Sequence, residues 1–469
     1  MFKVTLILLS LFFLKYTLVS KTNVILVMAD DQGWGQTGYN EHPILKTPNL
    51  DEMANSGIRF NRFYAGGPVC SPTRATVLTG RSPDRTGVFD HGYALRLQEK
   101  TLSQAMKDIG YSTGHFGKWH LNGLRGPGVP VLIDYPNGPK DFGFDQWISV
   151  TNFFDLNPIM SRNGNFENFT GDSSEIIVDC ALSFIKEQHK AKNPFFCVLW
   201  YGTPHSPFMS LEKDRAEFGT LNNESMNHYA ELKAMDRSIG DLRKGLRKLA
   251  IERNTLIWFM SDNGGLPKIK PSTTGGLRDF KGSLYEGGIR VPCIIEWPNG
   301  IPKQRITNYP AGAVDIAPTI AEIVGIPSDS FTKPQDGESL IELLRKDKTS
   351  RTKPLIFSSR GRMAVINNNW KLLSLPSKNQ TKFELYNLSV DMSEKFNIID
   401  DQKEIYLNLF KFIESKRASI QKSIDGHNYK EKYVKKQPPR KFWTDIESYK
   451  KYFDSWNNRP EYKSRLRNK

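Results

Sequence analysis

The chain has 469 residues, enough for one large folded core and a smaller partner unit. Hydrophobic residues make up 38% and aromatic residues 12% of the composition, which excludes a disordered chain. The net charge of +15 suits an anionic polymer as the partner, although a lysine-rich solvated surface would give the same balance.

The first 20 residues predict a secretory signal peptide. Lys3 precedes a nearly continuous apolar run over residues 4–14, and Ser20 is a small residue before a plausible cleavage point. The run is too short to span a bilayer, and no other segment is long and apolar enough to do so. We therefore expect a secreted or periplasmic protein (lysosomal or extracellular in a eukaryote) with no membrane span and no nucleic-acid partner.

Strands and helices alternate along residues 21–345. The continuous apolar run at residues 23–29 is typical of a central parallel strand. Further strands are expected at residues 111–116, 195–201, 255–260 and 291–297. Helices are expected at residues 70–79, 101–109, 172–190, 226–249 and 315–324. This alternation predicts an α/β fold with a large, mostly parallel sheet sandwiched by helices.

The pattern changes after about residue 350. Short strands are expected at residues 354–359, 363–367, 370–375 and 383–387, followed by a helix at residues 404–416. Residues 350–425 thus predict a smaller C-terminal antiparallel sheet with one helix. Residues 426–469 interleave Lys and Arg with Trp, Tyr and Phe, and so many large aromatics would be costly to leave exposed. We therefore expect this basic aromatic tail to pack near the active site.

The segment around Cys70 predicts an anion site. Pro72 suits the first turn of a helix, and Gly80 suits its end. Arg74 follows Cys70 by four residues, so both side chains share one face of the helix. A helix N-terminus with an arginine suits an oxyanion such as sulfate or phosphate. Taken alone, the pattern would more often be a buried cysteine beside a solvated arginine.

Polar residues follow the ends of four predicted strands, where open α/β sheets bind ligands. They are Asp30, Asp31, Lys118, His120, His205, Asp262 and Asn263. The acids and the amide supply hard oxygen ligands, which favour calcium or magnesium. Three carboxylates placed together would repel one another unless a cation lay among them. A metal site is therefore the favoured interpretation, with turns and helix caps as the alternative.

Several motifs resemble one known family. Cys70-Ser71-Pro72-Thr73-Arg74, with Thr79-Gly80-Arg81 after it, resembles the Cys-x-Pro-x-Arg signature of type I sulfatases. Gly117-Lys118-Trp119-His120 resembles the family's second signature. The segments at residues 203–205 and 278–290 resemble those that carry the family's second histidine and second lysine. The resemblance places the chain among the formylglycine-dependent, arylsulfatase-like enzymes of the alkaline phosphatase superfamily.

The resemblance implies an activity and a set of site residues. Cys70 would be oxidised to formylglycine by a formylglycine-generating or anaerobic maturing enzyme. One calcium ion, with magnesium as the alternative, would be held by Asp30, Asp31, the modified Cys70, Asp262 and Asn263. Asp262 would act as the base, His205 would protonate the leaving alcohol, and His120 would help to release the sulfate. The implied catalytic set is Cys70, Arg74, Lys118, His120, His205 and Lys281.

Export and positive charge together suggest a sulfated polysaccharide or oligosaccharide as substrate, from algae or from animal matrix such as a glycosaminoglycan. The candidate substrate-selecting residues are His91, Arg96, Asn152 and Arg278. Two other functions stay open. A phosphate-ester or phosphonate hydrolase of the same superfamily could use similar ligands. A binding protein for sulfated glycans, in which Cys70 is never oxidised, would fit the charge and the tail.

Overall fold

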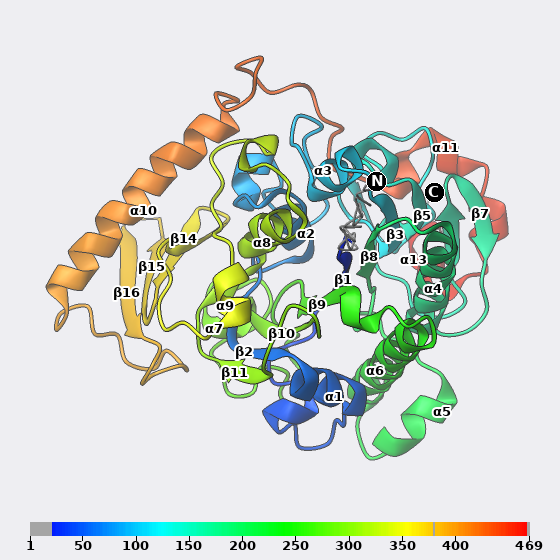
Figure 1. Ribbon diagram of the computed structural model, residues 1–469, viewed down its shortest axis with the longest axis horizontal. Helices are drawn as coiled ribbons and strands as arrows, with labels where there is room; N and C mark the ends of the chain where they lie inside the picture. The colour runs from blue at the N-terminus through cyan, green and yellow to red at the C-terminus, as the bar shows by residue number, and fades with distance from the viewer. Residues whose placement is uncertain (1–20, 379, 467–469) are drawn as a thin grey trace, which may run out of the picture.

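The computed structural model describes residues 21–378 and 380–466 (Figure 1). The predicted signal peptide at residues 1–20 lies outside the described residues. Within the described part of the chain, no helix is both long enough and apolar enough to cross a membrane.

A large mixed sheet forms the centre of the molecule. Its middle strand, β1 (Asn23–Ala29), runs parallel to β8 (Phe195–Trp200) on one side and to β9 (Thr255–Ser261) on the other. Next to β8 come β3 (Ser112–Lys118) and β5 (Gln146–Val150), again in parallel. The parallel centre confirms the predicted fold class.

Shorter or antiparallel strands complete the sheet, whose order is β11-β2-β10-β9-β1-β8-β3-β5-β6-β7, with β12 paired to β2. Strand β10 is antiparallel to both β9 and β2, and β5, β6 and β7 form an antiparallel meander. The bounds of these outer strands are β2 Ile58–Tyr64, β6 Ile159–Arg162, β7 Asn165–Asn168, β10 Arg290–Glu296, β11 Arg305–Thr307 and β12 Ala311–Gly312.

Helices cover both faces of the sheet, which explains why β1 is apolar at every position. Val24, Leu26 and Met28 pack in one core cluster with α2 (Cys70–Thr79), α3 (Leu102–Asp108) and α8 (Ile316–Val324). The alternate residues of β1 pack in a second cluster with α1 (Pro48–Ser56), α4 (Ser173–Ala191) and α6 (Asn223–Lys248). Successive strand side chains point to opposite faces, so both sets are buried. Three short helices lie in loops: α5 Glu212–Arg215, α7 Glu286–Ile289 and α9 Ile341–Arg345.

The predicted ends of several helices match the structure. The capping box of α3 is present between Thr101 and Gln104. Helix α2 ends at Gly80, which has a φ of 67°, a left-handed conformation that glycine adopts without strain. The sequence did not predict α1, β2 or β5. Strand β2 carries Arg59, Asn61 and Arg62 among its apolar residues, so its pattern is not that of a buried parallel strand.

The predicted C-terminal antiparallel sheet is present. Its strands run in the order β13 (Leu355–Ser359), β14 (Arg362–Asn367), β15 (Trp370–Pro376) and β16 (Thr381–Asn387). Helix α10 (Lys403–Ile424), longer than predicted, packs Leu409, Ile413 and Ile420 on one face of this sheet. The other face packs on Tyr64, Leu284 and Ile289 of the main unit.

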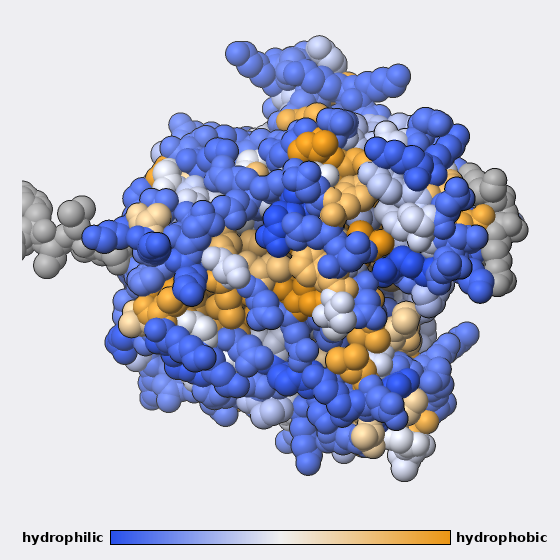
Figure 2. Space-filling model, turned by 90° about the vertical axis from the view of Figure 1, so that its right-hand side faces the viewer, coloured by the Kyte–Doolittle hydropathy of each residue, from blue (hydrophilic) through white to orange (hydrophobic). Residues whose placement is uncertain are grey.

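The chain then crosses the molecule. After α10 it passes over the top of the view in Figure 1 and reaches the opposite side, where α11 (Glu447–Lys450) and α13 (Pro460–Leu466) lie. Between them lies α12 (Phe453–Trp456), and before them β17 (Lys441–Phe442) pairs in parallel with β4 (Leu124–Arg125). The tail aromatics Trp443, Tyr449, Trp456 and Tyr462 bury Leu124, Val129 and Ile159. Figure 2 shows this side of the molecule, which is mostly hydrophilic with a band of hydrophobic residues across its middle.

Candidate active site

Four strand ends and one helix start meet at one edge of the large sheet. Asp30 and Asp31 follow β1, and Asp262 and Asn263 follow β9. Lys118 is the last residue of β3, with His120 just beyond it, and His205 follows β8. Cys70 is the first residue of α2. Because these strands are parallel neighbours, their carboxyl ends bring the residues together, as the sequence predicted.

A buried group of acids lies at the centre of the site. Single carboxylate oxygens of Asp30, Asp31 and Asp262 lie within 4.8 Å of one another. Each acid also has a basic partner. Lys118 Nζ donates to Asp30, Lys281 Nζ lies 2.7 Å from Asp31 Oδ2, and Arg74 donates to Asp262 Oδ2 at 2.7 Å. These contacts offset much of the repulsion among the carboxylates.

The oxygen atoms of this group fit a hard cation. Asp30 Oδ1 and Asn263 Oδ1 are buried without a hydrogen-bond partner in the described structure. The amide nitrogen of Asn263 donates to Asp31 Oδ1 at 2.7 Å, so its oxygen stays free. Burial, with Asp30 beside it, raises the pKa of Asp262 to about 6 in the metal-free protein. Unpaired, desolvated carboxylate and amide oxygens are hard ligands of the kind that calcium or magnesium binds.

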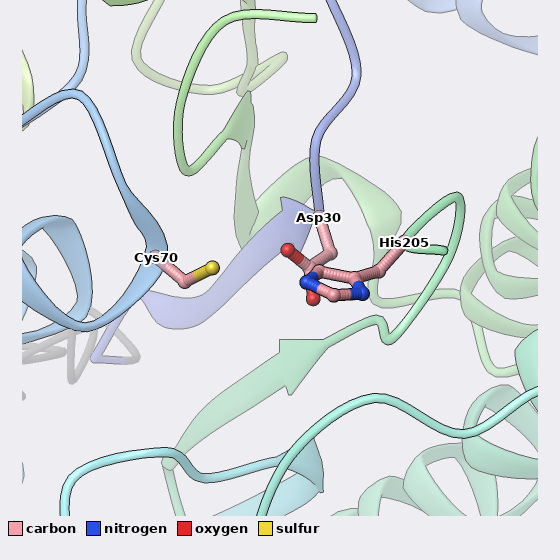
Figure 3. A group of neighbouring side chains, drawn as sticks. All are labelled: Asp30, Cys70 and His205. Carbon is pink, nitrogen blue, oxygen red and sulfur yellow. The ribbon is translucent and has the colours of Figure 1, made fainter. Parts of the chain in front are cut away.

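The Cys70 side chain points toward Asp30 and His205 (Figure 3). One ligand atom from each of the three residues lies within 4.8 Å of the others. Cys70 is 2% exposed, and its burial raises the pKa of the thiol to about 12. A thiol with that pKa stays protonated at neutral pH and is a poor nucleophile. Burial therefore keeps the unmodified Cys70 side chain in its thiol form.

Two histidines flank Cys70, and they differ in their hydrogen bonds. His120, held at a φ of 54°, has both ring nitrogens buried without a partner among the described residues. His205 Nδ1 donates to the carbonyl oxygen of Ser206 at 2.6 Å, which leaves Nε2, 3.8 Å from Asp31 Oδ2, as the free nitrogen. The His205 ring also stacks on Phe153, with ring centres 4.5 Å apart. Burial and neighbouring lysines hold both histidine pKa values well below the usual range, so both rings are neutral.

A cavity of ≈ 450 Å³ opens over these groups. Cys70, His120, His205 and Lys281 line its inner wall. The last residue of β4, the loop after it and the tail supply further lining residues: Arg125, Gly126, Pro127, Phe442, Pro460, Glu461 and Arg465. The tail that the sequence analysis separated from the catalytic region thus contributes to the wall of the same pocket.

The four candidate substrate-selecting residues have different positions. His91 and Asn152 line the cavity. Arg96 is not among the residues that line the cavity. Its buried guanidinium donates to the carbonyl oxygens of Ser423 and Ile424, so Arg96 holds the end of α10 and its link to the tail.

Arg278 also lies outside the residues that line the cavity. It donates to the hydroxyl of Tyr386 at 2.9 Å and to the carbonyl oxygen of Glu394 at 2.7 Å. Its guanidinium carbon also lies 3.8 Å from the centre of the Tyr285 ring. These contacts join the segment around Lys281 to the C-terminal sheet, a structural role that the sequence analysis did not foresee.

Sequence reasoning missed several residues of the pocket. Phe153 stacks on His205 from a segment 52 positions earlier in the chain, and Arg125 meets Phe442 across more than 300 positions. No local pattern marks either residue. The sequence offered one indication of the outer pocket, the high density of aromatic and basic residues in the tail. That density does not reveal which residues of the main unit the tail contacts.

Comparison with known proteins agrees with this geometry. The family model described as Sulfatase matches residues 22–326, and one described as N-sulphoglucosamine sulphohydrolase, C-terminal, matches residues 276–423. The N-acetylgalactosamine-6-sulfatase of Sus scrofa is 33% identical over 374 residues, which span 72% of this chain and 68% of that protein. The ulvan-active sulfatase of Formosa agariphila is 30% identical over 70% of this chain and 65% of that protein.

Among solved structures, Ps i-CgsB matches with a TM-score of 0.75 and 27% identity, over 84% of this chain and 92% of that one. The family match covers well over half of the sequence, and it includes every strand end that carries a site residue. The chain therefore belongs to the sulfatase family of sulfuric ester hydrolases, within the alkaline phosphatase superfamily.

Proposed function

We propose that this protein is an exported sulfatase that removes sulfate from a sulfated polysaccharide or oligosaccharide, with Cys70 converted to formylglycine and one calcium ion bound. One observation carries the proposal. Cys70 opens into a cavity between two neutral histidines and Lys281, beside buried carboxylates with an unpaired oxygen. Residues 1–20 would direct export, and maturation of Cys70 would need a formylglycine-generating or anaerobic maturing enzyme as partner.

The family implies two groups, a metal ion and a formylglycine, and the residues of the site could supply both. Asp30, Asp31, Asp262 and Asn263 would hold the metal, together with the modified Cys70. Formylglycine would supply a nucleophilic oxygen, and calcium would polarise the sulfate and lower the charge that develops on it. Calcium suits an all-oxygen set better than a softer metal does.

The remaining residues bind sulfate and move protons. Arg74 is fixed by Asp262 and by the carbonyl oxygen of Lys118, so its charge is held in place beside Cys70. Lys118 and Lys281 add positive charge around the sulfate position. His205 donates from Nδ1 to Ser206, so Nε2 faces the pocket without a proton. Nε2 would first take up a proton from solvent water and could then pass it to the leaving alcohol. His120, with both nitrogens unpaired, is suited to take a proton on the other side of Cys70.

The substrate class follows from charge and from relatives. The chain carries a net charge of +15, which favours polyanions. The relatives are named for N-acetylgalactosamine-6-sulfate and for ulvan, and Ps i-CgsB has also been solved in complex with k-i-k-neocarrahexaose. We assign catalysis to residues 21–345, support of the Lys281 segment to residues 350–425, and part of the pocket wall to residues 426–469.

The test is the mass of the peptide that contains Cys70, measured on protein purified with its maturing enzyme. We expect the mass of formylglycine in place of cysteine, together with turnover of an aryl sulfate and of one member of a panel of sulfated oligosaccharides. An unmodified Cys70 in protein that binds the panel without turnover would favour the glycan-binding alternative. Faster turnover of phosphate monoesters or phosphonates than of sulfates would favour the hydrolase alternative.

A further inference from the structure

The tail places an aromatic ring and an arginine beside Arg125 of β4 in the wall of the catalytic cavity. Strand β17 pairs with β4 so that Phe442 lies opposite Arg125. The guanidinium carbon of Arg125 lies 4.3 Å from the centre of the Phe442 ring, and that of Arg465, from α13, lies 4.7 Å from it. All three residues line the cavity that contains Cys70.

A third arginine lies behind them. Arg440 stacks over the ring of Tyr93 at 5.2 Å, and its Nε is buried without a hydrogen-bond partner in the described structure. Burial, followed by the charges of Arg440 and Arg465, lowers the pKa of Arg125, so both of these cations act on Arg125. We call Arg125, Arg440 and Arg465 the arginine cluster.

The described acids compensate the arginine cluster only weakly, because Asp90 acts on Arg125 from beyond ion-pair distance. Within residues 21–378 and 380–466, no carboxylate lies within ion-pair distance of its three guanidinium groups. The nearby acids have other partners. Glu461 Oε1 accepts from Arg459 at 2.5 Å, and Asp90 is shared by His91 and Arg360. The aromatic faces of Phe442 and Tyr93 hold the cations in place without using up their hydrogen-bond donors.

Two members of the cluster, Arg125 and Arg465, line the same cavity as Cys70, so one ligand can contact both these arginines and the catalytic groups. A volume of ≈ 450 Å³ is in the range that encloses a small organic ligand such as a disaccharide. A guanidinium group presents paired N–H donors that match sulfate and carboxylate oxygens. Of the cavity-lining residues assigned above to chemistry at Cys70, none comes from the tail.

We propose that Arg125 and Arg465, supported by Arg440, form a second anion subsite that binds a sulfate ester or a carboxylate on the sugar next to the one that carries the cleaved sulfate. This inference rests on the proposed function and narrows its substrate to glycans with a second negative charge near the scissile sulfate. The second anion binds where the cations otherwise repel one another, so it adds affinity and orients the sugar without touching the reacting atoms.

The test compares substrates that differ only in the second anion. The probes are p-nitrophenyl sulfate, N-acetylgalactosamine-6-sulfate, the same sugar joined to a uronic acid, and the same sugar carrying a second sulfate. The variants are Arg125→Gln and Arg465→Gln, alone and combined. Lys463→Gln is the matched control, because Lys463 lies on α13, is exposed, and is absent from the cavity lining.

We expect each arginine variant to lower kcat/KM on the doubly charged probes about fivefold, the upper range for a solvent-exposed charge pair. Turnover of p-nitrophenyl sulfate should stay within about twofold of the parent enzyme on the same scale. The doubly charged probe whose kcat/KM falls more in the arginine variants shows whether the subsite prefers a sulfate or a carboxylate. Equal losses on all probes, or the same loss in Lys463→Gln, would overturn the subsite.

A binding measurement separates this inference from the proposed function. The Cys70→Ala protein should bind the doubly charged probes more tightly than N-acetylgalactosamine-6-sulfate in titration calorimetry, and Arg125→Gln should remove the difference. Failure of the mature enzyme to cleave any sulfate would contradict the proposed function alone. Turnover of p-nitrophenyl sulfate with no arginine-dependent preference among the probes would contradict the subsite alone.

Discussion

Arg74 shows how one side chain can serve the fold and the site together. It is fully buried, donates to Asp262 and to the carbonyl oxygen of Lys118, and lies over the Trp200 ring at 5.1 Å. Its removal would leave the carboxylate of Asp262 desolvated without its closest cation. Loss of activity on substitution of Arg74 would therefore mix chemistry with folding, whereas Cys70 offers a cleaner test.

Replacement of Cys70 by alanine should abolish turnover and leave the fold intact. The substitution removes one buried sulfur atom, so we expect a loss of about 1 kcal/mol in the free energy of unfolding. Aryl sulfate hydrolysis and denaturant unfolding measure the two effects. Activity within tenfold of the parent would contradict the role of Cys70, because the remaining groups only bind and polarise.

At the scale of elements, helix α6 carries a buried histidine that links stability to pH. His228 lies 2.6 Å from the amide nitrogen of Gln36 and packs edge-on against Phe208 and Tyr229. Burial lowers the pKa of His228 from 6.5 to about 3. Between these pH values the unfolded chain binds a proton that the folded chain does not, so this contribution to stability is full above pH 6.5 and is lost as the pH falls.

We therefore expect the free energy of unfolding to fall by about 1.4 kcal/mol per pH unit from His228 alone within that window. The variant His228→Gln should show a slope shallower by about this amount, since its side chain does not titrate. The exposed His189→Gln variant is the control and should keep the parent slope. Identical slopes in all three proteins would show that His228 stays accessible to protons.

The tail is a second element with a structural contribution. Trp443 is fully buried and contacts the rings of Tyr449, Phe453, Trp456 and Tyr462. Trp443→Ala should cost about 3–5 kcal/mol in the free energy of unfolding, as for other large aromatic deletions. Removal of the whole tail would also expose Leu124 and Val129, so we expect the shortened chain to unfold at lower denaturant concentration. An unchanged midpoint for the shortened chain would show that the tail adds no stability.

At the scale of the whole molecule, the site joins segments from Asp30 to Asn263, so a metal bound there ties distant parts of the chain together. Chelation of the purified protein should abolish activity and lower stability. Calcium should restore both activity and stability. At a free calcium concentration one hundred times its dissociation constant, the free energy of unfolding should rise by about 2.7 kcal/mol. Denaturant unfolding with and without chelator, together with metal analysis, measures the effect.

The variant Asn263→Leu is the matched control for metal removal. It deletes the unpaired amide oxygen and should lose the calcium-dependent gain in stability. If calcium still raises the free energy of unfolding of Asn263→Leu, the metal binds at another site. Two zinc ions in the active protein would favour a phosphoryl-transfer site.

Local sequence patterns determined much of this protein. The apolar run of β1, the capping box of α3 and the glycine stop of α2 depend on residues close together in the chain, so they could be predicted. The site residues at the ends of β1, β3, β8 and β9 were also predictable, because parallel strands collect their carboxyl ends at one edge.

Only the tertiary structure decided the outer part of the pocket. Arg96 lies in a loop and Arg125 ends the two-residue strand β4, so neither belongs to a segment with a periodic pattern. Yet Arg96 holds α10, and Arg125 lines the cavity. Their roles depend on Ser423 and Phe442, which lie more than 300 positions away in the chain. Contacts at that separation arise from packing of the whole chain, and no local pattern encodes them.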